Sequence, residues 1–313
     1  MHDLLIIITP VFIVIGAGYL AVRTGVFADH FVDGLMVFTQ KFAVPCLLFR
    51  ATMDLDLGAV FDWRLLTAFY TGAILSFALA IIGARGLFGR RPGEAVSLGF
   101  AALFSNSVLL GLPVMERAFG TASLAPNYAI ISIHAPLCYF IGITMMEVSR
   151  VDGLSASATA QNVLKAMFKN ALMIGLALGF AVNLSGVTLP EPLIAAVDMM
   201  ARSALPAALF GVGGVLTRYS ISKSLGEVGM VASLSLVLHP AITYLLCTQV
   251  FELSTAFTRS AVLTASMAPG INSYVFANLY DRAKGEVASI VLVSTALCVL
   301  SVSAWLIILN TLP

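Results

Sequence analysis

Charge is the scarcest property of this sequence. Only 11% of its 313 residues are Asp, Glu, Lys or Arg, against about 25% in an ordinary soluble protein, while 59% are hydrophobic. A soluble fold cannot cover so much apolar surface with so few charges, which excludes a cytoplasmic enzyme, a nucleic-acid-binding protein and a disordered chain. The formal net charge of +1 provides no long-range field that would attract a charged partner.

Motifs that carry chemistry are missing as well. The four cysteines lie in apolar stretches without a Cys-x-x-Cys pair. The sequence contains no HExxH, GxSxG, P-loop or helix-opening GxGxxG motif. We therefore expect no enzyme, no metal and no cofactor. Met1-His2-Asp3 carries no basic residue, so the first apolar stretch is expected to be a spanning helix and not a cleavable signal peptide.

Long apolar runs are abundant instead. A spanning helix needs about 20 mostly apolar residues, and this length predicts an all-α polytopic membrane protein with ten transmembrane helices. The second, fourth, seventh and ninth are interrupted by Pro or Gly. The predicted spans are 4–22, 33–52, 64–88, 95–119, 124–148, 165–185, 192–217, 226–250, 259–280 and 286–311.

The basic residues predict the orientation of these spans. Eleven of the 17 Lys and Arg residues lie in loops that follow odd-numbered spans, and four lie in loops that follow even-numbered spans. Loops rich in Lys and Arg stay in the cytoplasm. We therefore expect the odd loops to be cytoplasmic and both termini to face the periplasm of a bacterial inner membrane.

An internal repeat divides the chain. A shift of 161 residues aligns residues 41–49 with 202–210, Gly18 with Gly179, and Ser105 with Ser266. Each repeat holds five spans, an odd number, so the second repeat enters the membrane from the opposite side. The sequence thus predicts a first repeat at 1–148, a cytoplasmic linker at 149–164 and an inverted second repeat at 165–313. Inverted repeats are typical of secondary transporters.

Two interrupted spans match under this shift. The windows 105–113 and 266–274 both combine Pro, Gly and Asn. Backbone groups freed by a broken helix need a polar cavity inside a membrane, and the N-termini of half-helices favour anions. Neither window holds an acidic residue, which favours a carboxylate as substrate. The residues expected to bind it are Asn106, Ser107, Gly111, Pro113, Pro269, Gly270, Asn272 and Ser273. Two ordinary proline kinks are the alternative interpretation.

These windows carry a family resemblance. The stretch 106–113 resembles the Asn-Thr-(apolar)₃-Gly-Ile-Pro motif of the plant PIN-FORMED auxin carriers, and 269–277 resembles the matching stretch of their ninth helix. The chain is similar over its whole length to the auxin efflux carrier family, in particular to its bacterial malonate-transporter-like branch. Plant carriers have Pro where this chain has Ser273, and Asn272-Ser273 would suit a smaller, more polar acid than auxin.

The resemblance implies the fold of the bile-acid symporters and of NhaA. In that fold, spans 1, 2, 6 and 7 form a scaffold, and spans 3–5 and 8–10 form a transport domain. Broken spans 4 and 9 cross where the substrate carboxylate binds. The resemblance also implies a homodimer formed through the scaffold.

Other polar residues inside spans are candidates for coupling or shaping. Lys41 and Arg202 are repeat-equivalent and could contact substrate or extend to the headgroups. His134, His239 and Asp198 could carry protons, although an embedded His more often bonds a backbone carbonyl freed by a neighbouring Pro.

Pro45 and Pro206 are expected to shape the scaffold helices. Together these patterns predict a secondary transporter of a small organic anion, such as malonate, that works by elevator-type alternating access. The expected partners are the carboxylate, the lipid bilayer and a coupling proton or sodium ion. The alternatives are a sodium- or proton-coupled symporter of another organic acid of the bile-acid type, and a non-transporting membrane sensor or channel.

Overall fold

Helices form the regular structure in the part of the chain that the computed structural model describes, which is residues 2–56, 58, 61–149, 171–220 and 224–312. Among these residues there is no strand, and the single antiparallel bridge joins Ser105 to Pro269. The predicted all-α class is therefore confirmed. Of the predicted linker at 149–164, only the first residue lies inside the described part.

The elements fall in the order that the apolar runs predict. In the first half they are α1 (His2–Arg23), α2 (Asp29–Phe38), the π-turn η1 (Thr39–Ala43), α3 (Val44–Met53), α5 (Trp63–Gly86), α6 (Pro92–Leu103), the π-turn η2 (Ser107–Gly111), α7 (Leu112–Phe119), the 3₁₀ turn η3 (Thr121–Leu124) and α8 (Ala125–Val148). In the second half they are α10 (Ala171–Ser185), α11 (Glu191–Leu216), α12 (Leu225–Ser233), the π-turn η4 (Leu234–Leu238), α13 (His239–Leu245), the π-turn η5 (Leu246–Val250), α14 (Thr255–Ala265), α15 (Ile271–Tyr280) and α16 (Lys284–Leu309).

Six helical segments of the described chain are long and apolar enough to cross a bilayer. They are Asp29–Met53, Trp63–Gly86, Thr121–Val148, Glu191–Leu216, Leu225–Val250 and Lys284–Leu309. Two further predicted spans correspond to the shorter apolar helices Thr9–Arg23 and Ala171–Ser185. The predicted spans 95–119 and 259–280 are each divided into two helices. The seventh predicted span differs from the expectation of an interruption, because α11 continues as one helix through Pro206.

Helix starts follow local side-chain chemistry. The Asp62 carboxylate accepts a hydrogen bond of 2.8 Å from the Arg64 backbone N–H and so caps α5. At α6, Pro92 takes the first position, where a missing N–H costs nothing. The Glu94 carboxylate accepts a bond of 3.0 Å from the Arg91 N–H at the same helix end.

Three of the π-turns have a common cause in proline. The turns η1, η2 and η4 each end two residues before a proline, at Pro45, Pro113 and Pro240. A proline ring lacks an N–H and clashes with the carbonyl four residues earlier, and a widened turn relieves that clash. Leu236 stands four residues before Pro240, and its carbonyl accepts a hydrogen bond of 2.6 Å from Ser301 Oγ instead.

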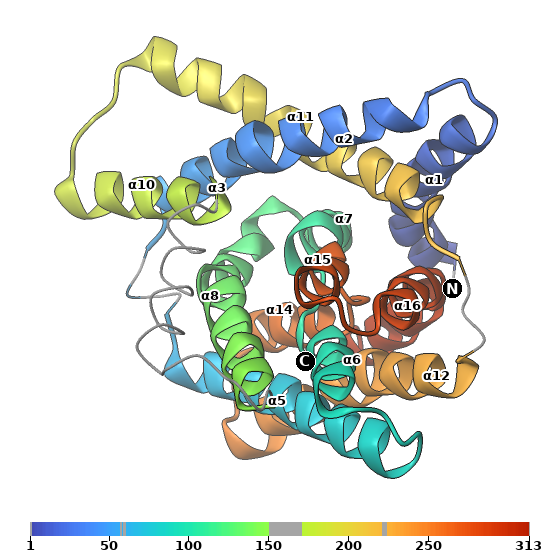
Figure 1. The fold of residues 1–313 in the computed structure, drawn as a ribbon. Coiled ribbons are helices and arrows are strands. Elements are labelled where there is room, and N and C mark those ends of the chain that lie inside the picture. Colours follow the sequence, from blue (N-terminus) through green and yellow to red (C-terminus); the bar gives the residue numbers. More distant parts are fainter. Residues whose placement is uncertain (1, 57, 59–60, 150–170, 221–223, 313) are drawn as a thin grey trace.

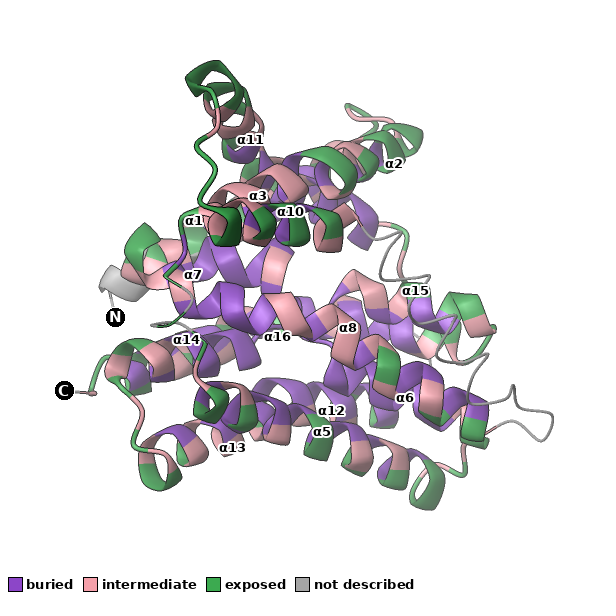
Figure 2. Ribbon diagram, turned by 90° about the vertical axis from the view of Figure 1, so that its left-hand side faces the viewer, coloured by how far each residue is buried: buried purple, intermediate pink, exposed green. Residues whose placement is uncertain are grey.

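The helices are arranged in two groups. Figure 1 shows α1, α2, α3, α10 and α11 running together along one side of the molecule, with α5, α6, α12, α14 and α16 on the other side. The view in Figure 2 also separates α1, α2, α3, α10 and α11 from the other helices, and it shows that buried residues concentrate toward the middle of the molecule. We call α1, α2, η1, α3, α10 and α11 the first group, and the remaining elements the second group.

Two glycines allow helices of the first group to touch at the backbone. A Cβ on Gly18 of α1 would overlap the carbonyl oxygen of Phe210 in α11. A Cβ on Gly179 of α10 would lie 2.7 Å from the carbonyl oxygen of Phe49 in α3. The 161-residue shift that aligns the two glycines also aligns the two phenylalanines. Glycine is therefore required at both positions by close helix approach.

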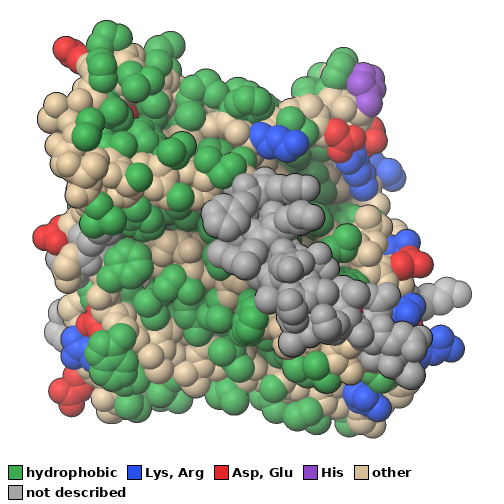
Figure 3. Space-filling view, turned by 60° about the vertical axis from the view of Figure 1, so that its left-hand side comes forward, with side chains coloured by type: hydrophobic (Ala, Val, Ile, Leu, Met, Phe, Trp, Pro, Cys, Tyr) green, Lys and Arg blue, Asp and Glu red, His purple; other side chains and the backbone are tan. Residues whose placement is uncertain are grey.

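The outer surface suits a bilayer. In Figure 3, most charged side chains lie toward two opposite edges of the face shown, and hydrophobic side chains are spread over the described surface between them. Large apolar side chains such as Ile82, Leu178 and Leu300 are more than half exposed. An apolar surface of this extent is unfavourable in water, so these helices belong to a multi-pass membrane protein.

Candidate functional site

The two broken helices meet at their breaks. The backbone N–H of Asn106 donates to the Ala268 carbonyl at 2.8 Å, and the N–H of Gly270 donates to the Phe104 carbonyl at 2.9 Å. Backbone groups that each break releases are thereby satisfied by the other break. Because an unpaired backbone group costs several kcal/mol in a membrane interior, this mutual pairing explains how both interruptions are tolerated.

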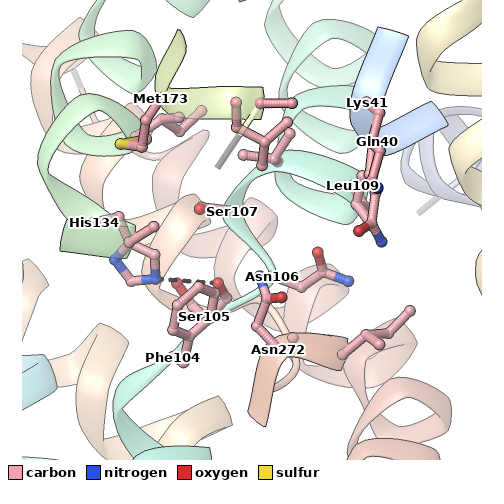
Figure 4. A pocket seen from close by; sticks show the side chains of 17 residues that line it. Gln40, Lys41, Phe104, Ser105, Asn106, Ser107, Leu109, His134, Met173 and Asn272 are labelled. Atoms are coloured by element: carbon pink, nitrogen blue, oxygen red, sulfur yellow. Dashed lines mark hydrogen bonds between the residues drawn. The ribbon is translucent and has the colours of Figure 1, made fainter. Parts of the chain in front are cut away.

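A cavity of about 410 Å³ opens beside the two breaks. Both segments contribute to its wall, together with η1, α8 and α10, as Figure 4 shows. The lining residues are Gln40, Lys41, Phe104, Ser105, Asn106, Ser107, Val108, Leu109, Ile131, His134, Ala135, Ala171, Leu172, Met173, Gly270, Ile271 and Asn272. No Asp or Glu occurs among these described residues, and Lys41 contributes the one charge.

Hydrogen-bond donors face this cavity from both breaks. η2 starts at Ser107 and α15 starts at Ile271, so two helix N-termini adjoin it. Asn106 is 8% exposed, and its side-chain amide has no hydrogen-bond partner within the described residues. Figure 4 shows Asn106 and Asn272 at the same end of the cavity. Unpaired amide donors and helix N-termini together form a suitable site for an anion.

Lys41 lies in the π-turn that precedes Pro45. Its side chain is exposed and has no ion-pair partner in the part of the chain that the structure describes. The sequence left open whether Lys41 would contact substrate or extend to the headgroups. The structure places it in the cavity lining, next to Gln40. Sequence reasoning missed Gln40, although its position beside the intramembrane lysine could have drawn attention to it.

The two embedded histidines bind backbone carbonyls of distant segments. His134 Nε2 lies 3.2 Å from the carbonyl oxygen of Ser105, at the break, and His134 lines the cavity. His239 Nε2 lies 3.1 Å from the carbonyl oxygen of Phe69 and lies outside the cavity lining. The Phe69 ring packs against both imidazoles, with centroid distances of 5.7 Å and 4.9 Å. Neither acceptor is a carbonyl freed by the neighbouring proline.

Several residues predicted for the site lie near the cavity without lining it. Pro269 pairs with Ser105 in the bridge between the breaks. Ser273 is fully buried, and its hydroxyl has no partner within the described residues. Gly111 closes η2. These residues shape the segments that carry Asn106 and Asn272.

A second pocket of about 490 Å³ collects most of the remaining candidates. It is formed by α1, α3, α7 and α11, and it includes Pro113, Asp198, Arg202 and Pro206. Asp198 accepts a hydrogen bond of 2.9 Å from the Arg50 guanidinium, so an ion pair joins α11 to α3 at this pocket. A third pocket of about 400 Å³ is lined mostly by apolar residues and includes Pro45, and Lys41 borders it as well as the first cavity.

Comparison with known proteins finds relatives over nearly the whole length of this chain. A protein of Rhizobium meliloti (strain 1021), named as a proposed malonate transporter, is 24% identical over 99% of this chain and 97% of its own length. An uncharacterized transporter of Methanothermobacter thermautotrophicus is 26% identical over 96% of this chain and 97% of its own length. The lysosomal cholesterol signaling protein of Mus musculus is 25% identical over 94% of this chain, which corresponds to 36% of that protein.

A family model settles the classification. The model described as Membrane transport protein matches residues 4–306 of this chain. This match covers nearly the whole chain, including both breaks and all elements that line the cavity. The chain therefore belongs to the membrane transport protein family, the auxin efflux carrier family that the motifs at 106–113 and 269–277 resemble.

Proposed function

We propose that this protein is a secondary transporter of a small carboxylate, specifically a dicarboxylate such as malonate. The observation that carries the proposal is the cavity at the two joined breaks. It combines unpaired amide donors, two helix N-termini and Lys41, and its described lining holds no carboxylate. Its volume of about 410 Å³ is near the lower end of the roughly 300–1,000 Å³ of small-molecule sites. The Rhizobium relative supports the choice of malonate.

Each charge of a dicarboxylate would find a different kind of partner in this cavity. Asn106, Asn272 and the N–H groups at the starts of η2 and α15 would donate to one carboxylate. The Lys41 ammonium would neutralise the second carboxylate. Leaving one of two charges unpaired inside a membrane would be costly, so this arrangement favours a diacid over a monoacid.

The transporter would contain ten spans in two inverted repeats, 1–148 and 165–313, joined by a cytoplasmic linker at 149–164. The matched contacts of Gly18 with Phe210 and of Gly179 with Phe49 support this symmetry. Gly18 and Gly179 are equivalent under the shift, as are Phe49 and Phe210. In each contact the glycine of one repeat therefore meets the phenylalanine of the other. The distribution of Lys and Arg supports periplasmic termini in a bacterial inner membrane.

Transport would proceed by an elevator movement of the second group of helices against the first. The first group would be the scaffold, and its exposed apolar side chains, such as Phe42 and Leu193, would form the homodimer contact. The second group would carry Asn106 and Asn272 across the membrane with the bound carboxylate. Exchanging the conformations of the two repeats would convert one access state into the other.

Proton or sodium coupling belongs to the same proposal. His134 is the best-placed proton carrier, because it lines the cavity and contacts the carbonyl of Ser105 at the break. His239 and Asp198 lie outside that cavity lining. A bound carboxylate would provide a counter-charge for a protonated His134, so substrate and proton would bind together.

Uptake of labelled malonate into proteoliposomes tests the proposal. We expect saturable uptake that an imposed proton gradient stimulates. Stimulation by sodium alone would favour a sodium-coupled symporter of the bile-acid type, and exchange that ignores both gradients would indicate an uncoupled facilitator. Binding of malonate without uptake or counterflow would favour the sensor alternative, to which the mouse signaling relative draws attention. Absence of both binding and uptake would contradict the choice of substrate.

A further inference from the structure

Two basic residues at equivalent repeat positions line different pockets. Lys41 lines the cavity at the breaks, and Arg202 lines the second pocket between α1, α3, α7 and α11. The 161-residue shift aligns them. Both side chains are exposed, and neither has an ion-pair partner within the described residues. A cation that forms no ion pair at a hollow inside a membrane protein needs an explanation.

The walls of the two pockets also correspond. Residues 40–41 and 171–172 of the first group line the cavity at the breaks. The shift maps these four positions onto 201–202 and 10–11, and all four of those residues line the second pocket. The second pocket is therefore built from the same scaffold positions of the opposite repeat. An incidental surface hollow would not reproduce this correspondence.

Both pockets also take part of their second-group wall from the same broken segment, while α8 and the second break complete the wall of the cavity alone. The cavity takes residues 104–109, at the break and the start of η2. The second pocket takes Pro113, Glu116 and Arg117 from α7, farther along the same segment. The two pockets thus lie at successive positions along one half-helix, each facing a basic residue of the first group.

Charge in the second pocket leaves Arg202 available for an anion. Arg50 is engaged by Asp198 at 2.9 Å. Glu116 is a second carboxylate of this lining and accepts a hydrogen bond of 3.3 Å from the neutral Thr121 hydroxyl, and Arg117 has an interaction of its own. The lining therefore holds the three arginines Arg50, Arg117 and Arg202 against the two carboxylates Glu116 and Asp198, which leaves one positive charge in excess. The guanidinium of Arg202 can bind a carboxylate with two parallel hydrogen bonds, which an ammonium cannot do.

We propose that the second pocket is a carboxylate-binding station for the opposite access state, with Arg202 as its anion contact. This inference rests on the proposed function. Substrate would meet Lys41 from the cytoplasmic side and Arg202 from the periplasmic side, because inverted repeats place the two positions in opposite halves of the membrane. Each cation would draw the dicarboxylate toward Asn106 and Asn272 in its own access state.

Sided transport kinetics test this inference. The probe is labelled malonate, and the preparation is proteoliposomes in which the protein has one known orientation. Half-saturation concentrations are measured for entry from each side. For Arg202→Gln, we expect the half-saturation concentration from the Arg202 side to rise about tenfold more than that from the Lys41 side, the effect of losing a charged hydrogen bond. Lys41→Gln should show the reverse asymmetry.

Two further variants control the experiment. Arg202→Lys keeps the charge but loses the two-point geometry, so its asymmetry should be intermediate. Arg85→Gln removes an exposed arginine that lines neither pocket, and it should leave both half-saturation values unchanged. Equal effects of Arg202→Gln on both sides, or none on either, would overturn the inference while wild-type uptake upholds the proposed function. No malonate uptake by the wild type would overturn both.

Discussion

At the residue scale, two buried asparagines behave in opposite ways. Asn127 of α8 is completely buried and fully engaged with α14. Its amide donates to Thr264 Oγ1 at 2.6 Å, and its carbonyl accepts from Ser260 Oγ at 2.7 Å. Asn106 is nearly as buried, yet its amide has no partner within the described residues. A mostly buried polar group without a partner calls for an explanation, and a ligand bound in the cavity that Asn106 lines is the one we propose.

This contrast predicts separable losses of function and stability. Asn106→Ala and Asn272→Ala should each lower malonate uptake at least about tenfold, because they remove charged hydrogen bonds to substrate. Their melting temperatures in detergent should stay close to that of the wild type. Asn127→Ala should instead lower stability by about 1–3 kcal/mol, since it strands two buried hydroxyl groups. Normal uptake by both Asn106→Ala and Asn272→Ala would remove the proposed site.

At the element scale, helix packing in the first group depends on glycine more than on side-chain fit. Gly18 and Gly179 let α1 and α10 approach the backbones of α11 and α3. Gly175, one turn before Gly179, meets Pro45 of α3 in the same way. The glycine pair of α10 therefore serves packing within one chain.

Adding one methyl group should disturb this packing. Gly18→Ala and Gly179→Ala should each destabilise the protein by about 1–3 kcal/mol, because helix backbones must move apart. Gly16→Ala is the matched control on α1, since a Cβ there would meet nothing within 4 Å. Thermal unfolding in detergent measures the difference. Equal melting temperatures for Gly18→Ala and Gly16→Ala would contradict the tight contact.

At the scale of the whole molecule, ion networks hold each group of helices together from within. Arg218 donates to Asp33 at 2.6 Å and to Asp29 at 2.8 Å, which ties the end of α11 to α2. These two hydrogen bonds raise the pKa of Arg218 above its ordinary value. In the second group, Arg90 contacts Glu227 at 2.8 Å and Glu286 at 2.9 Å.

Each of these networks joins elements of one group only, at the ends of helices. Arg218 joins α11 to α2, while Arg90 joins the turn after α5 to α12 and α16. Glu227 and Glu286 lie in the first turns of their helices, where the helix dipole favours negative charge. Such internal clamps would let the two groups move as bodies, as the elevator proposal requires.

The proposed orientation predicts which loops reach which side of the membrane. Leu87, 77% exposed after α5, should be cytoplasmic, and Thr188, between α10 and α11, should be periplasmic. Leu87→Cys should react with an impermeant thiol reagent only from the cytoplasmic side, and Thr188→Cys only from outside. The parent protein is the control, because Cys138, Cys247 and Cys298 are buried and any background labelling would come from Cys46, which is partly exposed. Labelling from the reverse sides would overturn the topology.

Local chemistry was enough to determine much of this architecture. Apolar run lengths located the helices, since a bilayer demands a minimum length and internal hydrogen bonding. Proline and glycine located the second break at 266–270, which contains Pro269 and Gly270. The first break, at 104–106, lies before Gly111 and Pro113, which belong to η2 and α7. The sequence could not reveal that α11 stays continuous through Pro206, because packing against α1 and α3 helps to hold that helix.

Only the tertiary structure decided where each polar side chain points and which group it bonds. By itself, the sequence determined the all-helical membrane class, the broken windows and the pairing of their residues under one shift. It predicted one site for all these residues. It could not separate Asn106 and Asn272, which line the cavity, from Pro113, which lines another pocket, and from Ser273, which is buried. Nor could it place His134 against the carbonyl of Ser105. Hydropathy and backbone breaks depend on neighbours in sequence, whereas a side chain's direction and its hydrogen-bond partner depend on helices that are distant in the chain.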